Sequence, residues 1–500
     1  MYKVPALLIA IVLAFGFDAG AIEAEAAEQY PWSGDRSAER SLTFELWEER
    51  GSQATSIYRI LDYQTPGPNG IQESRLCDSI TVGPCAQALN GTKDGFQGTF
   101  VAPVCEKPSD ENCIEWIAVH ENDEPASKAT LLRNIEGGTT PKLSKYGLPK
   151  GGTTSLWSQA GKTNAGGTDT YAATLSLEVQ YESQTAIPQA NFEIAAYNFQ
   201  IRPYKEVQGD FRPHSCSEGK YLGVVVVSCG GIPDECAWSG NGICGEEVGF
   251  PSNTRVSASF RIDATTSGWF AGRVQDPNIS IKRINDSQLR VQISGQPSDV
   301  PVARGHMPTS NASAALKAQY SQACPEFRST GSCWSGVLAG GTESMKYIEG
   351  FRGQFNDTAT YQRQVWSVRT VRSGYLGQCA SGDSKVIGIV STNAMGYQSE
   401  PPRFTGGFLS YQVSGMHYLP DGQELALGNY DLIVRSDYAR CLYGFGRAPL
   451  SANVSVVNNA GDKVFATTTV GEKNGWLKLS AKGFTFSKKT IKVKITKKKR

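Results

Sequence analysis

The chain has 500 residues, a formal net charge of +1, 40% hydrophobic residues and 19% charged residues. This length exceeds what one hydrophobic core usually organises, so we expect several domains. The balanced charge argues against a nucleic-acid-binding protein, which would show a strong basic excess. Glycine (53), tyrosine (20) and phenylalanine (20) are abundant, which favours strands and turns over long helices.

Residues 1–26 have the pattern of a secretory signal peptide. Lys3 supplies a positive start, residues 4–17 are almost entirely apolar, and Ala24 and Ala26 offer small residues for cleavage. We expect cleavage after Ala26, with residues 19–21 as the alternative site. A membrane anchor is the other interpretation, but the apolar run is shorter than the roughly 20 residues that span a bilayer. The sequence therefore predicts a secreted protein, extracellular or associated with the cell envelope, without a membrane span after signal removal.

Twelve cysteines, an even number, suit disulfide formation outside the cytosol. Zinc sites and redox dithiols prefer shorter spacings, so both are disfavoured. Cysteines eight positions apart enclose short loops that contain turn-forming residues, and a disulfide that closes such a loop should stabilise the fold by about 2–3 kcal/mol. Pairing nearest neighbours, the simplest of many connectivities, predicts Cys77–Cys85, Cys105–Cys113, Cys216–Cys229, Cys236–Cys244, Cys324–Cys333 and, over a longer range, Cys379–Cys441.

Period-two alternation of apolar residues predicts strands at 42–46, 175–181 and 256–262. Turn residues between short apolar runs predict hairpins at 279–293 and 454–465. Helical periodicity is scarce, and the best helix candidates are 312–322 and 360–371.

Glycine-, threonine- and proline-rich stretches suggest domain boundaries. We expect, after the signal peptide at 1–26, a β domain with two disulfide loops at 27–136 and a central β domain at 137–308. A mixed segment with short helices follows at 309–400, and a β domain with a basic tail closes the chain at 401–500.

The last hundred residues contain six short apolar runs whose spacing suits an immunoglobulin-like sandwich. The predicted fold class is therefore mainly β and multidomain, with antiparallel β-sandwiches, an immunoglobulin-like C-terminal domain, a few short helices and disulfide-stapled loops. The predicted strands are 408–413, 430–434, 454–457, 464–470, 476–479 and 491–495.

Several stretches resemble a C-terminal module of uncharacterised secreted and cell-surface proteins of actinobacteria. They are 390–394, 397–402, 430–437, 439–445 and 474–477, and the stretches 105–116 and 147–157 resemble the same proteins. The resemblance implies an exported protein of a Gram-positive envelope. It carries no activity and transfers no functional residue.

The sequence names no catalytic or metal-binding residue and implies no cofactor. His120, His214, His306 and His417 lie far apart, without a metalloprotease pair, and no Gly-x-Ser-x-Gly motif occurs. Histidine, serine and acidic residues distant in sequence can still form a triad in space. Paired carboxylates of a glycosidase are the remaining option, but the sequence does not show which carboxylates face each other.

Possible ligand contacts are Trp238, Trp157 and Trp334, which lie in Gly/Ser-rich stretches where an exposed ring could stack on a sugar. Packing beneath the loops is the competing interpretation for each tryptophan. The lysine-rich C-terminal end suggests contact with an anionic polymer. The alternative is that these lysines keep a solvated edge strand from pairing with other strands. The residues of this basic end are Lys492, Lys494, Lys497, Lys498, Lys499 and Arg500.

We therefore hypothesise a non-catalytic interaction protein of the cell envelope or extracellular space. A cell-wall polymer or another surface protein would be its partner. A secreted glycan hydrolase is the alternative, and a surface-layer subunit is a further one.

Overall fold

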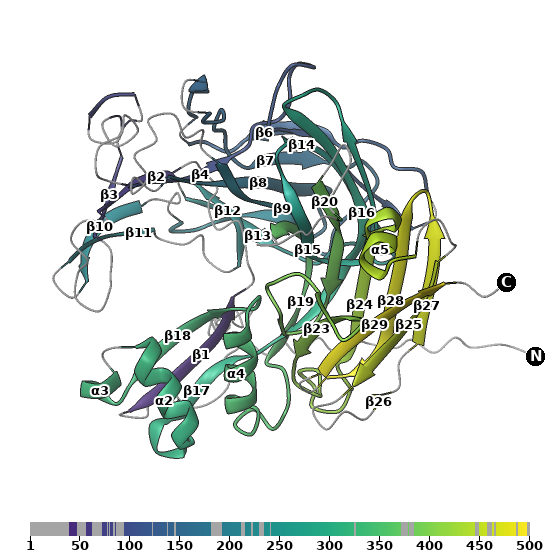
Figure 1. Ribbon diagram of the computed structural model, residues 1–500. Helices are drawn as coiled ribbons and strands as arrows, with labels where there is room; N and C mark the ends of the chain where they lie inside the picture. The colour runs from purple at the N-terminus through teal and green to yellow at the C-terminus, as the bar shows by residue number, and fades with distance from the viewer. Residues whose placement is uncertain are drawn as a thin grey trace, which may run out of the picture.

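A computed structural model gives the fold of the chain (Figure 1). It describes residues 40–47, 57–62, 73–77, 79, 81–83, 86, 95–122, 124–137, 139–144, 147–181, 193–211, 216–221, 224–229, 235–240, 242–324, 327–371, 379, 385–445, 450–457, 463–464, 467–486 and 489–497. The expected signal peptide, Cys85, His214 and the last three residues of the basic end lie outside this part.

Strands dominate the described residues, as the mainly β prediction requires. The first layer consists of four strands in the order β5–β14–β16–β15, all antiparallel. Their bounds are β5 Ile114–Glu121, β14 Thr254–Asp263, β15 Ser267–Arg283 and β16 Gln288–Val302. Val256, Ala258, Phe260 and Ile262 of β14 are fully buried, so the alternation read from the sequence marks the inner face of this layer.

A second layer faces the first, and the two share one hydrophobic core. Ile117 and Val291 of the first layer, with Leu177 and Phe199 of the second, belong to that core. The strands of the second layer are β2 Ile57–Asp62, β3 Glu73–Leu76, β4 Gly95–Val101, β6 Thr130–Asn134, β7 Ser155–Ser158, β8 Thr170–Tyr181, β9 Glu193–Gln208 and β19 Tyr361–Val371.

Two hairpins extend from this region. One is β10 Cys216–Tyr221 with β11 Val224–Cys229, in which Cys216 lies opposite Cys229. The other is β12 Cys236–Gly240 with β13 Ile243–Glu247, and β13 adds to the edge of β9.

The C-terminal strands also form two layers around a core of their own, which includes Tyr411, Tyr430, Leu432 and Leu479. One layer is β20 Lys385–Thr392, β24 Leu427–Arg435, β28 Trp476–Thr485 and β27 Thr467–Lys473. The other is β21 Gly396–Tyr397, β22 Arg403–Thr405, β23 Phe408–Ser414, β29 Lys489–Lys497, β25 Leu450–Val457 and β26 Lys463–Val464. Five of the six strand runs expected in this region each lie within one strand, and the run at 464–470 falls on β26 and β27, with residues 465–466 outside the described part. Helix α5 (Ser436–Tyr443), which the sequence did not predict, follows β24.

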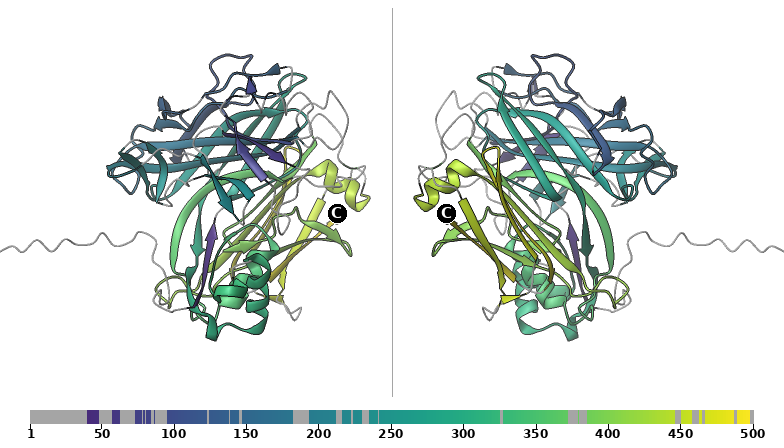
Figure 2. Two further views of the ribbon diagram at one scale, coloured as in Figure 1. Left: turned by 90° about the vertical axis from the view of Figure 1, so that its left-hand side faces the viewer. Right: turned by 90° about the vertical axis from the view of Figure 1, so that its right-hand side faces the viewer.

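A small third sheet and the remaining helices lie at one end of the molecule. The strand β1 (Ser41–Trp47) lies between β17 (Arg304–Pro308) and β18 (Cys333–Leu338). In both views of Figure 2, the purple β1 lies apart from the other early strands, near the helices at the bottom. Those helices are η3 Thr309–Asn311, α2 Ala314–Ala323, α3 Phe327–Thr330 and α4 Thr342–Phe351. Among the described residues, no helix has the length and apolarity needed to cross a bilayer.

The helix predicted at 360–371 is wrong. Residues Tyr361–Val371 form β19, which pairs with β9, β15 and β16. Trp366 and Val368 lie on one face of this strand, in the core between the first two layers, whereas Tyr361 and Val365 lie on the other face and pack against the core that contains β1. Because both faces carry apolar residues, the sequence shows no simple alternation here. The helix predicted at 312–322 is present as α2, and Ser313 caps its first turn.

Four of the six expected disulfides lie within the described residues: Cys105–Cys113, Cys236–Cys244, Cys324–Cys333 and Cys379–Cys441. Cys77 is also disulfide-bonded, but Cys85 is not described, and the side chains of Cys216 and Cys229 are not described either. These bonds are consistent with an extracellular protein.

Strands pair across the domain boundaries that the sequence suggested. The pair β1–β18 spans the expected boundaries at 136 and 308, and the pair β20–β24 spans the one at 400. The division at 136, 308 and 400 stays a prediction.

The strand β15 links the two halves of the fold. Its first part pairs with β19 and β20, and its second part pairs with β16, with a bulge between Gln275 and Asn278. At that bulge the Asp276 N–H donates to the buried Asp431 carboxylate at 3.0 Å, and the Asp276 carboxylate pairs with Lys478 at 2.7 Å and Arg255 at 3.0 Å. Burial raises the pKa of Asp431 to about 6.

Replacing Asp431 with Asn should therefore stabilise the protein above neutral pH. A raised pKa means that the protonated carboxyl favours the fold; this stability is present below pH 4 and is lost as the pH rises through about 6. D431N should exceed the wild type by up to about 3 kcal/mol at pH 8 and roughly equal it at pH 4. Thermal unfolding between pH 4 and 8 measures this difference. The matched variant D286N, on the exposed β15–β16 turn, should follow the wild type, and a D431N effect that does not change with pH would contradict the explanation.

Candidate functional site

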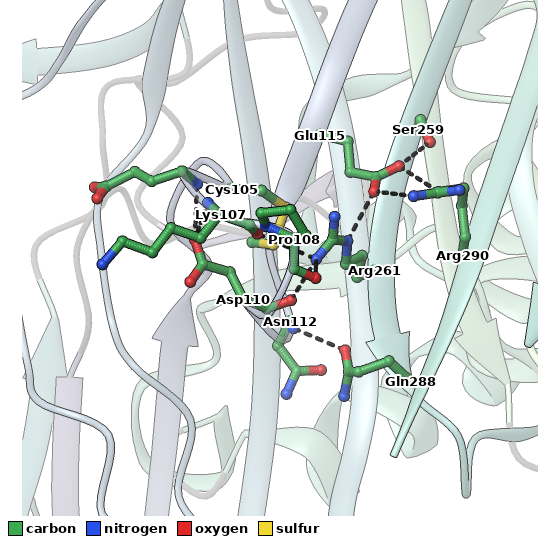
Figure 3. The surroundings of a disulfide bond; sticks show 12 residues. Cys105, Lys107, Pro108, Asp110, Asn112, Glu115, Ser259, Arg261, Gln288 and Arg290 are labelled. Atoms are coloured by element: carbon green, nitrogen blue, oxygen red, sulfur yellow. Dashed lines mark hydrogen bonds and ion pairs between the residues drawn. A yellow bond between two sulfur atoms is a disulfide. The ribbon is translucent and has the colours of Figure 1, made fainter. Parts of the chain in front are cut away.

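The candidate site lies on the outer face of the first layer, beside the Cys105–Cys113 loop (Figure 3). It starts from an irregularity in β5. Trp116 lies opposite Ser259, but the next pair is Ile114 with Phe260, so Glu115 is an extra residue in the strand. Such a bulge changes which way neighbouring side chains point. Ile114 and Ile117 both enter the core, which leaves Glu115 and Trp116 together on the outer side.

Glu115 binds two arginines. Its carboxylate accepts from Arg261 Nε at 2.7 Å, from Arg290 Nε at 2.7 Å and Nη2 at 2.8 Å, and from the Ser259 hydroxyl at 2.7 Å. The side chain of Glu115 is only 11% exposed. Burial alone would raise the pKa of Glu115, but the hydrogen bonds from Arg290, Ser259 and Arg261 lower it to about 2. The carboxylate is therefore ionised at every physiological pH and fixes both guanidinium groups.

Arg261 also binds the loop that the Cys105–Cys113 disulfide closes, called the stapled loop below. Its Nη1 donates to the carbonyl oxygens of Pro108 at 2.6 Å and Asp110 at 2.8 Å, and more weakly to that of Lys107 at 3.4 Å. Figure 3 shows Arg261 between Glu115 on one side and these loop carbonyls on the other. One buried arginine thus joins the sheet to the loop.

The loop has further internal support. The Asp110 carboxylate accepts from the N–H groups of Glu106 at 2.7 Å and Lys107 at 2.8 Å. At the other end, the Asn112 N–H donates to the side chain of Gln288 at 3.0 Å. With the disulfide closing both ends, the loop is held at several points, so the exposed side chain of Lys107 projects from a fixed backbone.

A depression of about 420 Å³ lies between the loop and the sheet. Four cationic side chains and two carboxylates line it, an excess of two positive charges; they are Lys107, Lys128, Arg261, Arg290, Glu106 and Glu115. Lys128 lies with its ammonium 5.8 Å from the centre of the Trp116 ring, an attractive arrangement for a cation. No ion pair is recorded for Lys107 or Lys128 within the described part, so their ammonium groups face solvent.

A second depression of about 420 Å³ lies beside α5, but its charges are already matched. There Arg435 pairs with Asp437, and Arg440 pairs with Glu472 at 2.6 Å. The depression beside the stapled loop is therefore the better candidate for an external ligand.

The residues that the sequence suggested do not gather at this site. Trp238 is 3% exposed and packs against Tyr204 at 5.8 Å and beneath Arg133 at 5.0 Å. The expectation overlooked β9, which supplies a core for this loop. Trp157 is 4% exposed and donates to Ser155 at 2.8 Å, so neither ring offers an open face. The backbone of Trp334 lies in β18, and its side chain is outside the described part.

The basic end lies on another sheet. Lys492 and Lys494 share the outward side of β29, and the Lys494 ammonium lies 5.7 Å from the Phe408 ring centre. Lys497 ends β29 with its side chain undescribed, and Lys498, Lys499 and Arg500 are not described. The structure thus places two of the six basic residues on one face, away from the stapled loop.

The described histidines lie in three separate settings. His120 is bonded to Ser257 at 2.8 Å, His306 to Thr43 at 2.8 Å, and His417 to the Asp357 carboxylate. His120 and Ser257 are 5% and 6% exposed, so this pair is enclosed in the fold. No group of three or more metal-ligating side chains occurs among the described residues.

The sequence reasoning missed Glu115, Arg261 and Arg290. Only one signal was available: the stretch from Ile114 to Val119 departs from alternation, because its inward residues Ile114 and Ile117 are three positions apart.

No protein-family model matches the chain, and no curated protein matches it.

Substituting Glu115 by Gln should destabilise the protein by about 2–3 kcal/mol at pH 7, because both arginines lose their counter-charge. With a pKa lowered to about 2, the carboxylate contributes stability above its ordinary pKa of 4.5, and this stability is lost as the pH falls towards 2. Urea unfolding at pH 7 and pH 3 should therefore show a larger deficit at pH 7. The neighbouring exposed Glu106, as E106Q, is the control; an E115Q protein as stable as E106Q at pH 7 would refute the assigned role.

Proposed function

We propose that this protein is an exported, non-catalytic interaction protein of the cell envelope or extracellular space, and that it binds an anionic polymer at the depression beside the Cys105–Cys113 loop. The observation that carries the proposal is the set of solvent-facing cations, Lys107, Lys128 and Arg290, held on a rigid face. Fixed cations attract a flexible anionic ligand without first having to be ordered themselves.

Secretion is supported by the signal-like sequence of residues 1–26 and by the disulfides. The kinship with secreted actinobacterial proteins rests on sequence stretches alone. An immunoglobulin-like C-terminal domain is supported by two facing layers of strands around one core. An anionic glycan-type polymer suits the compartment better than nucleic acid, because the net charge of the chain is only +1.

The hydrolase alternative has less support from the described residues. Glu45, near the end of β1, is 5% exposed and lies 3.5 Å from Arg304. Asp263 closes a turn by accepting from Thr265 at 2.7 Å. Both carboxylates are thus engaged in structural contacts. The surface-layer alternative, which predicts ordered self-assembly, stays a prediction.

The double substitution of Lys107 and Lys128 by Gln tests the proposal. The secreted protein should bind immobilised polygalacturonate, and binding should weaken with added salt because the contacts are exposed. K107Q/K128Q should lose about tenfold in affinity, since each exposed ionic contact is worth up to about 1 kcal/mol.

The matched control is K317Q, on α2 and far from the depression, which should bind like the wild type. Both variants should keep the wild-type unfolding temperature, because no ion pair is recorded for any of the three lysines within the described part of the chain. Equal affinity of the double variant and K317Q, or binding of duplex DNA in preference to the acidic glycan, would overturn the proposal.

A further inference from the structure

The cationic surface continues past the depression, across the strands. Lys282 on β15 lies opposite Arg290 on β16, and Arg290 lies opposite Arg261 on β14. Ile279 and Ile281 contact the core, so Lys282 points to the outer face with the two arginines. Three cations thus lie in register on three neighbouring strands, about 5 Å from one strand to the next.

This arrangement is unfavourable without a ligand. Like charges directly opposite each other on adjacent strands destabilise a sheet. Glu115 is the carboxylate bound to Arg261 and Arg290, while Lys282 is exposed and has no recorded ion pair within the described part of the chain. An anion lying over Lys282 and Arg290 would relieve the repulsion between them.

The two arginines differ in what they can offer. Arg261 is 8% exposed, and its Nε and Nη1 are engaged by Glu115 and the loop carbonyls. Arg290 is 36% exposed and gives Glu115 its Nε and Nη2. The opposite edge of the Arg290 guanidinium, between Nη1 and Nη2, is left with two N–H groups that match the oxygens of a carboxylate or phosphate. Arg261 therefore anchors the loop to the sheet, and Arg290 is the arginine that can contact a ligand.

We infer that the ligand is a linear polymer bearing a carboxylate or phosphate on each repeat unit, and that it lies across the strands from Lys282, over Arg290, to Lys128. Lys128 lies in the segment that follows β5 and bonds to it, through Ala129 N–H to the Ile117 carbonyl at 2.9 Å. The path crosses four strand spacings, about 19 Å. That span fits an oligomer of several units and exceeds a single sugar acid. The inference rests on the proposed function and adds the ligand's length and direction.

A length series on the intact secreted protein tests this path. Galacturonic acid, its trimer and its hexamer form one arm, and glycerol-phosphate oligomers of matched length form the other, so that carboxylate and phosphate are compared. Wild-type affinity should rise with length in at least one arm. K282Q should lower affinity for the hexamer about threefold to fivefold and leave the monomer unchanged.

Two further variants separate the possible failures. R290Q should weaken binding at every length, and K317Q at none. If the wild type binds no oligomer in either arm, the proposed function fails. If it binds, but affinity does not grow with length or K282Q matches K317Q on the hexamer, the polymer path is wrong and a small-anion site at Arg290 remains. Each variant is checked by its unfolding temperature; a destabilised R290Q is replaced by R290K, which keeps the charge but loses the two-pronged contact.

Discussion

The interaction on which the candidate face depends is the one between Glu115 and the guanidinium groups of Arg261 and Arg290. It follows from a bulge in β5, which turns Glu115 outward beside Trp116. A single carboxylate with low exposure satisfies one arginine that supports the loop and a second that faces solvent. The one negative charge offsets only one of the two positive charges, so the cluster keeps a net charge of +1 on this face.

The strand β15 connects the candidate face to the rest of the fold. The strand pairs with β20 at its start and with β16 at its end, so both halves of the fold meet along it. Its bulge at Asp276 is fixed by a buried carboxylate on β24 and by lysine and arginine from β28 and β14. Lys282 emerges six positions later, and its alignment with Arg290 therefore depends on the register that this bulge sets.

Sequence patterns predicted the strands whose two faces differ and failed where both faces of a strand carry apolar residues. In β14 every second residue from Val256 to Ile262 is apolar and buried, so the prediction was straightforward. In β19 Trp366 and Val368 enter one core while Tyr361 and Val365, on the other face, pack against another, so the apolar residues follow no period of two. The exposure predicted for Trp238 is wrong because the core that covers its ring comes from β9, which is distant in sequence. Glu115 and its arginines could not be predicted, since only strand register brings 115, 261 and 290 together.

The disulfide and Arg261 constrain the same loop in complementary ways. The Cys105–Cys113 bond fixes where the loop begins and ends, and limits the unfolded chain more than it shapes the folded one. Arg261 binds carbonyl groups in the middle of the loop and determines which way its backbone faces. Carbonyl oxygens that point inward to Arg261 leave the Lys107 side chain outside. A small loop with almost no core of its own thus presents a cation in a defined place, which is what a binding surface requires and what the covalent bond alone would not supply.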